Sequence, residues 1–495
     1  MITRSENTPL SRLCVLSGHK AQKGRYITMY KAKSMACIGV GFSLMMSCLF
    51  GCGQNVPASS SVNTPSGDTS LIQELTRRDE PITLTYASWS DEEYVNWMIK
   101  GFEEKYDWIK VENIKMSQSS WESGLFNLAS SRDLPDVFWT FSLHGAAANG
   151  WLLDITELYN KDAYTQSISD GLKQVGVYDG IRYGVAVHQM PDCVFVNKTL
   201  FEQCNLELPS YNWKVDDMIN LAKQMSQPNQ NIFGFNSTCY LDALYPTAKS
   251  GVGPKGFNAA DGTFDFSAWA EGVNMKQALL KQRVICDMTP EALEKAYGSA
   301  DFWPPESGKI GICTDWYWTT QYMKSEAFSS KGIEWLIYPM PTDTGKVITT
   351  VDVGGVSATT EYPEEAYALL KYMNFGQDGW MRKIDYYKSK GTKPTALPIA
   401  NDSTVWNALN KELTPGEDYA ALYNSLSESV PEEQMWLPGY NDWYNWTWEQ
   451  DIWNRVNNGE LKAEDIAPVM AKKLQECYTD GLQALKEMRE EQSAG

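Results

Sequence analysis

The sequence predicts an α/β protein with two doubly wound lobes. Its 495 residues exceed the size that one hydrophobic core normally serves, so two or more lobes are expected. Apolar residues make up 43% of the chain, which allows a sizeable core and excludes wholesale disorder. Strand-like and helix-like patterns alternate along the chain, and that order is typical of sheets covered by helices.

Five segments in the first part of the folded region show this alternation. Every second residue is apolar or aromatic over 82–86, which predicts a strand, and large apolar residues recur at every fourth position over 94–106, which predicts a helix. An extended run follows at 108–116, then a helical stretch at 121–131 and a strand-like run at 134–139. Strand, helix and strand in this order imply a parallel sheet.

The same alternation continues as far as residue 375. Extended and helical patterns follow one another, which carries the α/β class into a second lobe. The extended patterns cover 183–189, 193–200, 309–316 and 333–341, and the helical patterns cover 215–225, 271–285 and 363–375.

The first 51 residues have the pattern of a lipoprotein signal peptide. An uncharged run of apolar and small residues covers 34–51, and basic residues precede it, which is compatible with a start at Met1 or at Met29. The run ends in the letters LFGC, which resemble the bacterial lipobox, where cleavage precedes a cysteine that then receives a diacylglycerol. The alternative is an uncleaved transmembrane anchor, for which the run is short. We therefore predict a signal peptide over 1–51 and lipidation at Cys52, on the extracytoplasmic face of the cell membrane.

Residues 52–79 are predicted to form the lipid anchor and a flexible tether. They are rich in Ser, Pro, Asn and Gly and contain few large apolar residues. No later stretch has the uncharged apolar length that a membrane span needs. Six cysteines follow Cys52 without C-x-x-C spacing, so we expect buried thiols or at most isolated disulfides.

Charge and motifs limit the partners and the chemistry. The net charge of −19 opposes binding to nucleic acid or to anionic lipid headgroups. The chain has three histidines and lacks H-E-x-x-H, G-x-S-x-G, Walker-type glycine loops and metal-ligand clusters. We therefore expect that the protein is not an enzyme. We also expect no nucleic-acid partner, no cofactor and no metal.

Nine segments in a fixed order carry a resemblance to a known family. They are 83–89, 134–139, 149–158, 179–187, 195–209, 211–213, 307–318, 337–341 and 351–359. Together they resemble the extracellular solute-binding proteins of ABC importers, in the sugar-binding group that includes maltose-binding protein. The resemblance covers most of residues 80–485, and departures at 196–198 and 211–213 bear on specificity rather than on fold.

This resemblance implies a two-lobed periplasmic-binding-protein fold whose doubly wound sheets are joined by a multi-strand hinge. The ligand would lie between the lobes, hinge closure would bury it, and a membrane permease would take it from the closed form. The chain would cross between lobes near 187–192, 338–341 and 375–380. The lobes would be 80–188 plus 340–376 (N-terminal) and 189–339 plus 377–490 (C-terminal).

The 19 tryptophans and 26 tyrosines supply candidate sugar-binding surfaces, because a flat ring stacks on the C–H face of a sugar. The resemblance points to Trp316 and Trp318 as stacking residues, with core packing of one of them as the alternative. It also places an aromatic contact at Trp443 or Tyr444. The helical spacing of the tryptophans in that segment favours the core instead.

Polar candidates follow the first strand and the strand-like run at 134–139. The family places acids against ligand hydroxyls at such strand ends, so the resemblance implies ligand contacts for Asp91 and Glu92, with capping of the next helix as the alternative. Trp89, just before them, is a further candidate ligand contact. Trp139 and His144 lie in a segment that contributes to the ligand cleft in the family, and a surface or capping role is the alternative for the histidine.

The remaining candidates lie at the first crossing and in a later loop. His188 and Gln189 stand where the family often places a polar ligand contact, and the alternative for the histidine is a hinge residue bonded to backbone. Tyr240 and Asp242 occupy the position of another cleft segment in the family.

These observations predict a substrate-binding lipoprotein of an ABC transporter. It would act as a monomer that captures a mono- or oligosaccharide and delivers it to the permease. A glycoside hydrolase remains an alternative, because it needs only two carboxylates about 5–10 Å apart. A carbohydrate-sensing surface lipoprotein that is not coupled to import is another, and polyamines are an alternative ligand for an acidic, tryptophan-rich site.

Overall fold

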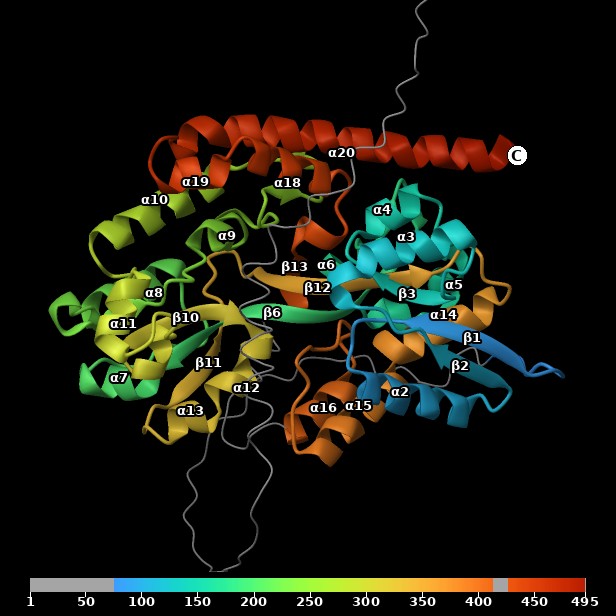
Figure 1. Cartoon of the computed structure of the whole chain (residues 1–495), viewed down its shortest axis with the longest axis horizontal. Coiled ribbons are helices and arrows are strands. Elements are labelled where there is room, and N and C mark those ends of the chain that lie inside the picture. Colours follow the sequence, from blue (N-terminus) through green and yellow to red (C-terminus); the bar gives the residue numbers. More distant parts are fainter. Residues whose placement is uncertain (1–74, 413–425, 495) are drawn as a thin grey trace, which may run out of the picture. The chain divides into compact units, whose positions relative to one another are not determined.

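The computed structural model describes residues 75–412 and 426–494 (Figure 1). Cys52, the predicted signal peptide and most of the predicted tether lie outside these residues, and their assignments stay predictions. Among the described residues, no helix combines the length and the apolar character that crossing a membrane requires.

Strands and helices alternate, as the sequence predicts. The strands are β1 (Ile82–Ala87), β2 (Ile109–Asn113), β3 (Val137–Thr140), β4 (Val177–Tyr178), β5 (Ile181–Arg182), β6 (Val185–Asn197), β7 (Phe233–Phe235), β8 (Phe257–Asn258), β9 (Thr263–Phe264), β10 (Ile310–Trp316), β11 (Trp335–Pro339), β12 (Val347–Val356) and β13 (Ser429–Pro431). The helices are α2 (Glu92–Lys105), α3 (Trp121–Ser131), α4 (Leu143–Ala148), α5 (Thr156–Lys161), α6 (Asp170–Lys173), α7 (Lys198–Gln203), α8 (Val215–Met225), α9 (Leu241–Tyr245), α10 (Ser267–Lys281), α11 (Pro290–Tyr297), α12 (Thr320–Met323), α13 (Glu326–Ser329), α14 (Pro363–Asn374), α15 (Gln377–Lys390), α16 (Ser403–Glu412), α18 (Tyr440–Glu449), α19 (Ile452–Asn457) and α20 (Ala463–Ala494). The 3₁₀ turns of the described residues include η6 (Tyr317–Thr319) and η8 (Glu433–Met435).

Nine strands of the described residues form one mixed sheet. Its order is β2-β1-β3-β12-β6-β10-β7, with β11 also paired to β6 and β13 to β12. The predicted parallel pairing of the first three strands is confirmed, because β1 runs parallel to both β2 and β3. Strand β12 runs antiparallel to β3 and β6. Helices cover the strands on both sides (Figure 1), so the α/β class is confirmed.

Strand β6 links the two parts of this sheet, at the centre of Figure 1. Its first half pairs with β12, and from Asp192 onward it pairs with β10 and β11. Pro191 stands at this change of partners, where the lack of an N–H is tolerated best. The sequence predicts two separate extended segments here, but the structure forms one strand of 13 residues. The strand ends at Asn197 because its side-chain oxygen accepts the Leu200 N–H and caps α7.

Three large cores pack around these strands. One core surrounds β1, β3 and the first half of β6. The other two cores lie on opposite faces of the second half of β6. Val194 and Val196 face one of these cores, and Cys193 and Phe195 face the other. The six cysteines after Cys52 are free thiols, and all except Cys204 are buried, as expected.

The lobe boundaries stay a prediction, and helix α15 bears on the third crossing. This helix packs against α2 and α14, which both belong to the segments expected for the N-terminal lobe. Lys105 pairs with Asp378 at 2.5 Å, and the Trp97 indole N–H donates to the Arg382 carbonyl at 3.2 Å. We propose that residues 377–390 belong with the N-terminal lobe and that the third crossing lies beyond them.

Candidate ligand-binding site

A row of polar and aromatic side chains lies on one face of the sheet where β6, β10 and β12 meet. Side chains two residues apart on a strand point to the same face. The ladder register places Asp352 opposite His188, Thr350 opposite Met190 and Trp316 opposite Asp192. We call this row the central face, and it consists of His188, Met190, Asp192, Trp316, Thr350 and Asp352. Of these, Met190, Trp316 and Thr350 are partly exposed.

Aromatic rings form one end of the central face. Trp316 stacks on Trp318 with ring centroids 4.9 Å apart and planes 11° apart, and Tyr240 lies 5.1 Å from Trp316. Strand β10 ends here because the Asp315 carboxylate accepts the Trp316 N–H at 2.8 Å, after which the chain turns into η6. The Trp316 indole N–H donates to the Thr350 hydroxyl at 3.0 Å. Both tryptophans are partly exposed, so the pair can offer a flat apolar surface.

A second aromatic group lies at the other end. Trp139 is buried, donates its indole N–H to Asn374 at 3.0 Å and meets His188 edge-on at 5.2 Å. Trp89 packs against Trp139 at 5.0 Å and stacks on Phe141 at 4.4 Å. The structure therefore brings three predicted residues, Trp89, Trp139 and His188, together at this end.

The two residues predicted at the first crossing have different surroundings. His188 lies within 2.8 Å of Asp352 through Nε2, and both side chains are buried. Gln189 points to the opposite face, because alternate residues on a strand do. Its amide donates to the Pro398 carbonyl at 2.7 Å and accepts from the Ser429 hydroxyl at 3.1 Å. Gln189 thus holds neighbouring segments in place.

Two carboxylates that the sequence did not single out lie on or next to the central face. Asp192 Oδ1 is buried and has no hydrogen-bond partner among the described residues. Glu432 accepts from the Thr350 hydroxyl at 2.9 Å, which makes a chain from Trp316 through Thr350 to Glu432. Period-two alternation from His188 points to Asp192, whereas only the three-dimensional register reveals Thr350 and Glu432.

Burial raises the pKa of three acids near the point where β6, β10 and β12 meet. It raises the pKa of Asp315 to about 6 and that of Glu433 to about 7. The pKa of Asp192 is raised well above its usual range by burial first, and then by the charges of Glu432 and Asp315.

The acids predicted after the first strand form local interactions. Asp91 caps α2, because its carboxylate accepts the backbone N–H groups of Glu93 and Tyr94. This is the helix-capping role that the sequence offers as the alternative. Glu92 is exposed and pairs with Lys115.

Asp242, predicted in the later loop, also has a cationic partner. Its carboxylate pairs with Lys276 of α10 at 3.3 Å. Tyr240, two residues earlier, is the member of that predicted pair that reaches the central face, through its contact with Trp316.

Two other predicted residues pack against α20, which contacts α4, α10 and α18. His144 bonds through Nε2 to the Gly481 carbonyl at 2.9 Å, and burial lowers the pKa of this histidine. Trp443 is fully buried and donates its indole N–H to the Met470 carbonyl at 3.2 Å. It is a core residue, as the helical spacing favours, and offers no surface to a ligand. Tyr444 is partly exposed and stacks on Tyr440 at 6.0 Å.

Comparison with known families decides the class of the protein. The family model for bacterial extracellular solute-binding proteins matches residues 87–375, which is more than half of the chain. The chain belongs to this family. A search of curated proteins finds no match.

Solved structures of this class share the fold. An ABC substrate-binding protein of Listeria monocytogenes, solved in complex with cycloalternan, is 18% identical, with a TM-score of 0.60 over 80% of this chain and 99% of that chain. The cyclic α-maltosyl-1,6-maltose binding protein of Arthrobacter globiformis is 16% identical, with a TM-score of 0.60 over 81% of this chain and 100% of that chain. The sugar-binding protein MalE of Xanthomonas citri is 14% identical, with a TM-score of 0.58 over 82% and 98%. These likenesses confirm the two-lobed periplasmic-binding-protein fold.

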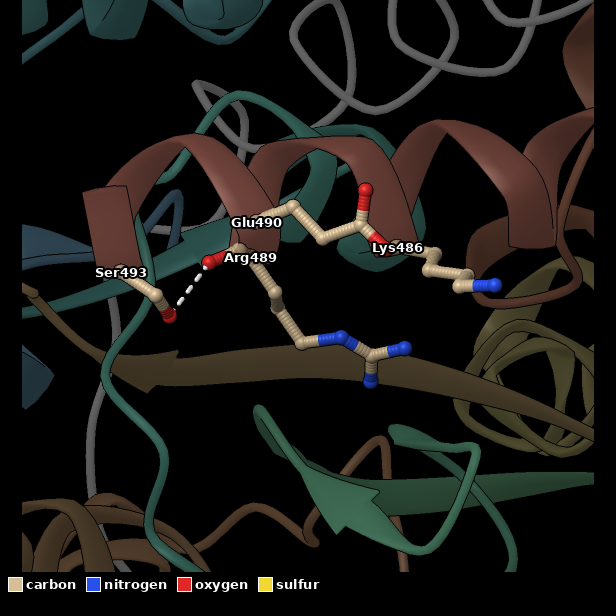
Figure 2. Close-up of a pocket in the computed structure, with 4 residues that line it drawn as sticks. All are labelled: Lys486, Arg489, Glu490 and Ser493. Carbon is tan, nitrogen blue, oxygen red and sulfur yellow. Dashed lines mark hydrogen bonds between the residues drawn. The ribbon is translucent and has the colours of Figure 1, made fainter.

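A hollow on α20 does not suit the ligand of a solute-binding protein. Figure 2 shows its lining side chains, Lys486, Arg489, Glu490 and Ser493, all on this one helix, around a volume of about 330 Å³. Arg489 pairs with Asp179 at 2.9 Å, and the Ser493 hydroxyl donates to the Arg489 carbonyl at 2.8 Å. None of the described residues that line it is aromatic, so the central face is the better candidate.

Proposed function

We propose that this solute-binding protein captures a carbohydrate on the central face and delivers it to the permease of an ABC importer. The stacked pair of Trp316 and Trp318 carries this proposal, because a partly exposed indole beside carboxylates matches the two sides of a sugar. The indole covers the C–H face of the ring, and the acids accept hydrogen bonds from its hydroxyls. The sugar ligands named for the structural relatives support the same ligand class.

The surroundings of the pair favour ligand binding over catalysis. Two carboxylates near the pair already accept hydrogen bonds within the protein, Glu432 from the Thr350 hydroxyl and Asp315 from the Trp316 backbone N–H. We propose binding without chemical change to the sugar.

Thermal unfolding against a panel of neutral mono- and oligosaccharides tests the ligand class. A ligand that binds only the folded state stabilises it by RT ln(1 + [L]/Kd), about 4 kcal/mol at a thousandfold excess over Kd. We expect at least one sugar to raise the melting temperature and to be recovered unchanged. Cleavage of that sugar would favour a hydrolase, and a panel without any shift would contradict the proposal.

Two tryptophan variants test the site. Trp316→Ala and Trp318→Ala should each weaken sugar binding by about tenfold or more, because stacking and desolvation are lost. Phe126→Ala is the matched control, since this aromatic ring is exposed on α3. Equal losses in all three variants would argue against the central face.

We also propose that the mature chain is held on the extracytoplasmic face through lipid on Cys52 and works there as a monomer. Cys52→Ser should abolish labelling by a fatty-acid analogue and shift the protein from the membrane fraction to the soluble fraction. Membrane retention of the unlabelled variant would indicate an uncleaved anchor instead.

A further inference from the structure

Asp192 is the carboxylate of the central face that lacks a partner. The residue is 6% exposed, and its Oδ1 atom has no hydrogen bond among the described residues. Its ladder partner is Trp316, so the two side chains lie on the same face, at the aromatic end of the site. A buried carboxyl group in this position is costly without a hydrogen-bond donor, and none of the described residues donates one to its Oδ1 atom.

The surrounding groups add negative charge rather than removing it. Glu432 donates its backbone N–H to the Thr349 carbonyl at 2.9 Å, and Thr349 is the ladder partner of Pro191, the neighbour of Asp192. Asp315 follows on the adjacent strand, opposite Cys193. Lys255 is the cation that acts on Asp192, against the two carboxylates of Glu432 and Asp315. The environment therefore favours a positively charged group beside Asp192.

The other acids of the site already have partners. Asp352 is paired with His188, and Glu432 accepts the Thr350 hydroxyl. Asp192 is thus the carboxyl group that the site leaves for a ligand, next to a partly exposed indole.

We propose that the ligand is an amino sugar whose ammonium group pairs with Asp192 while its ring stacks on Trp316 or Trp318. This inference rests on the proposed carbohydrate function and names the substrate class of the same site. A neutral hydroxyl supplies only the missing donor, whereas an ammonium group supplies the donor and the opposite charge.

Isothermal titration with matched sugars tests the preference. Glucose, N-acetylglucosamine, glucosamine and their β-1,4-linked oligomers carry a hydroxyl, an acetamide or an ammonium group on the same ring position. Maltose and its oligomers extend the neutral set. We expect the ammonium ligands to bind about tenfold or more tightly than the neutral ones, as charge-assisted hydrogen bonds do.

Proton release gives a second readout on the unmodified protein. Pairing with an ammonium group ionises Asp192, so at mildly acidic pH an amino sugar should release a proton that a neutral sugar does not release. Titrations in two buffers with different heats of ionisation measure this release. Equal release for both ligand classes would overturn the role of Asp192.

Asp192→Asn completes the test, because it keeps the shape of the side chain and removes the charge. We expect it to abolish both the ammonium preference and the proton release. Asp107→Asn is the control, since Asp107 is exposed and pairs with Arg77 on the surface. If Asp192→Asn fails to fold, the ligand series on the unmodified protein still decides.

The outcomes separate the two proposals. Neutral sugars that bind as tightly as amino sugars would overturn this inference and leave the carbohydrate function standing. Binding of no carbohydrate of either class would overturn both.

Discussion

At the residue scale, Lys383 shows how strongly one buried charge affects the stability of the protein. It lies on α15 and is 6% exposed, with its ammonium nitrogen 3.9 Å from the centre of the Trp380 ring. Burial lowers the pKa of this lysine from 10.5 to about 7. The cation–π contact offsets only part of the cost of burying the charged form.

Replacing this lysine should stabilise the protein. The pKa of Lys383 is lower in the folded state than in the unfolded state, so burying the charged lysine destabilises the folded protein. This destabilisation is complete below about pH 7 and disappears as the pH rises towards 10.5. Lys383→Met should therefore raise the free energy of unfolding by about 1–3 kcal/mol at neutral pH, and less at alkaline pH. Urea denaturation at several pH values measures this difference. A gain that does not change with pH would show that Lys383 does not titrate in this way.

Two tryptophans of the same predicted role should behave in opposite ways. Trp443 is fully buried among core side chains, so Trp443→Ala should lower the free energy of unfolding by about 3–5 kcal/mol. Trp316 is partly exposed and bonds to Thr350, so Trp316→Ala should cost only about 1–2 kcal/mol while it weakens ligand binding. Urea denaturation of both variants measures the contrast. Similar losses of stability would contradict the division into core and site.

At the scale of elements, Asn197 fixes the junction between β6 and α7. Its side-chain oxygen accepts the Leu200 N–H at 3.0 Å, and its amide donates to the carbonyls of Gly308 and Ile310 at 3.1 and 3.0 Å. All its polar atoms are therefore satisfied in a fully buried position.

Removing this side chain should destabilise the protein, because both the hydrogen bond that it accepts and the two that it donates are lost. Asn197→Ala should lower the free energy of unfolding by about 2–4 kcal/mol, because it loses a helix cap and removes a donor from the buried Ile310 carbonyl and from the partly exposed Gly308. Asn197→Asp keeps the capping oxygen but turns an acceptor oxygen towards the two carbonyls in place of the donors, so it should destabilise the protein at least as much as Asn197→Ala. Chemical denaturation measures both variants, and a loss below 1 kcal/mol in Asn197→Ala would contradict this account.

Local periodicity explains which elements were predictable. It is set within the element itself, so the order from β1 to β3 and its parallel pairing followed from the sequence. The continuity of β6 through Pro191 did not, because strands on other parts of the chain supply its partners. Helix α15 is a similar case, since its packing on α2 is a long-range contact.

The candidate site was predictable only where chemistry coincides with a local signal. Trp316 ends a recognisable strand, Trp318 follows in the next turn, and both lie in a segment that carries the family resemblance, so the sequence points to them. Thr350 and Glu432 carry no such signal, because β12 and η8 bring them to Trp316 from distant positions. Trp443 was ambiguous because packing against α20, rather than its own helix, decides its burial.

For the whole molecule, the junction of the two sheet parts concentrates buried acids in a chain that is already negative. Asp192 lies on β6, Asp315 on the adjacent β10 and Glu433 in η8, and burial raises the pKa of each. Such groups are neutral in the folded state at a pH where the unfolded chain has already ionised. Each therefore stabilises the fold at low pH, and that contribution is lost as the pH rises through its folded pKa.

Glu433 allows the strongest test of this pH dependence. Its carboxyl group accepts the backbone N–H of Lys255 at 2.9 Å, and the pKa of Glu433 is raised from 4.5 to about 7. Its contribution to the stability of the fold is therefore lost as the pH rises from about 4.5 to about 7. Glu433→Gln keeps the hydrogen-bond acceptor and cannot ionise. Relative to the unmodified protein it should gain stability with rising pH, reaching about 2–4 kcal/mol above pH 7. Thermal and urea unfolding from about pH 4.5 to 8 measure the difference, which should be smallest at the acidic end, where both side chains are neutral. A constant difference would mean that Glu433 ionises equally in the folded and unfolded chains and does not contribute to the pH dependence of the fold.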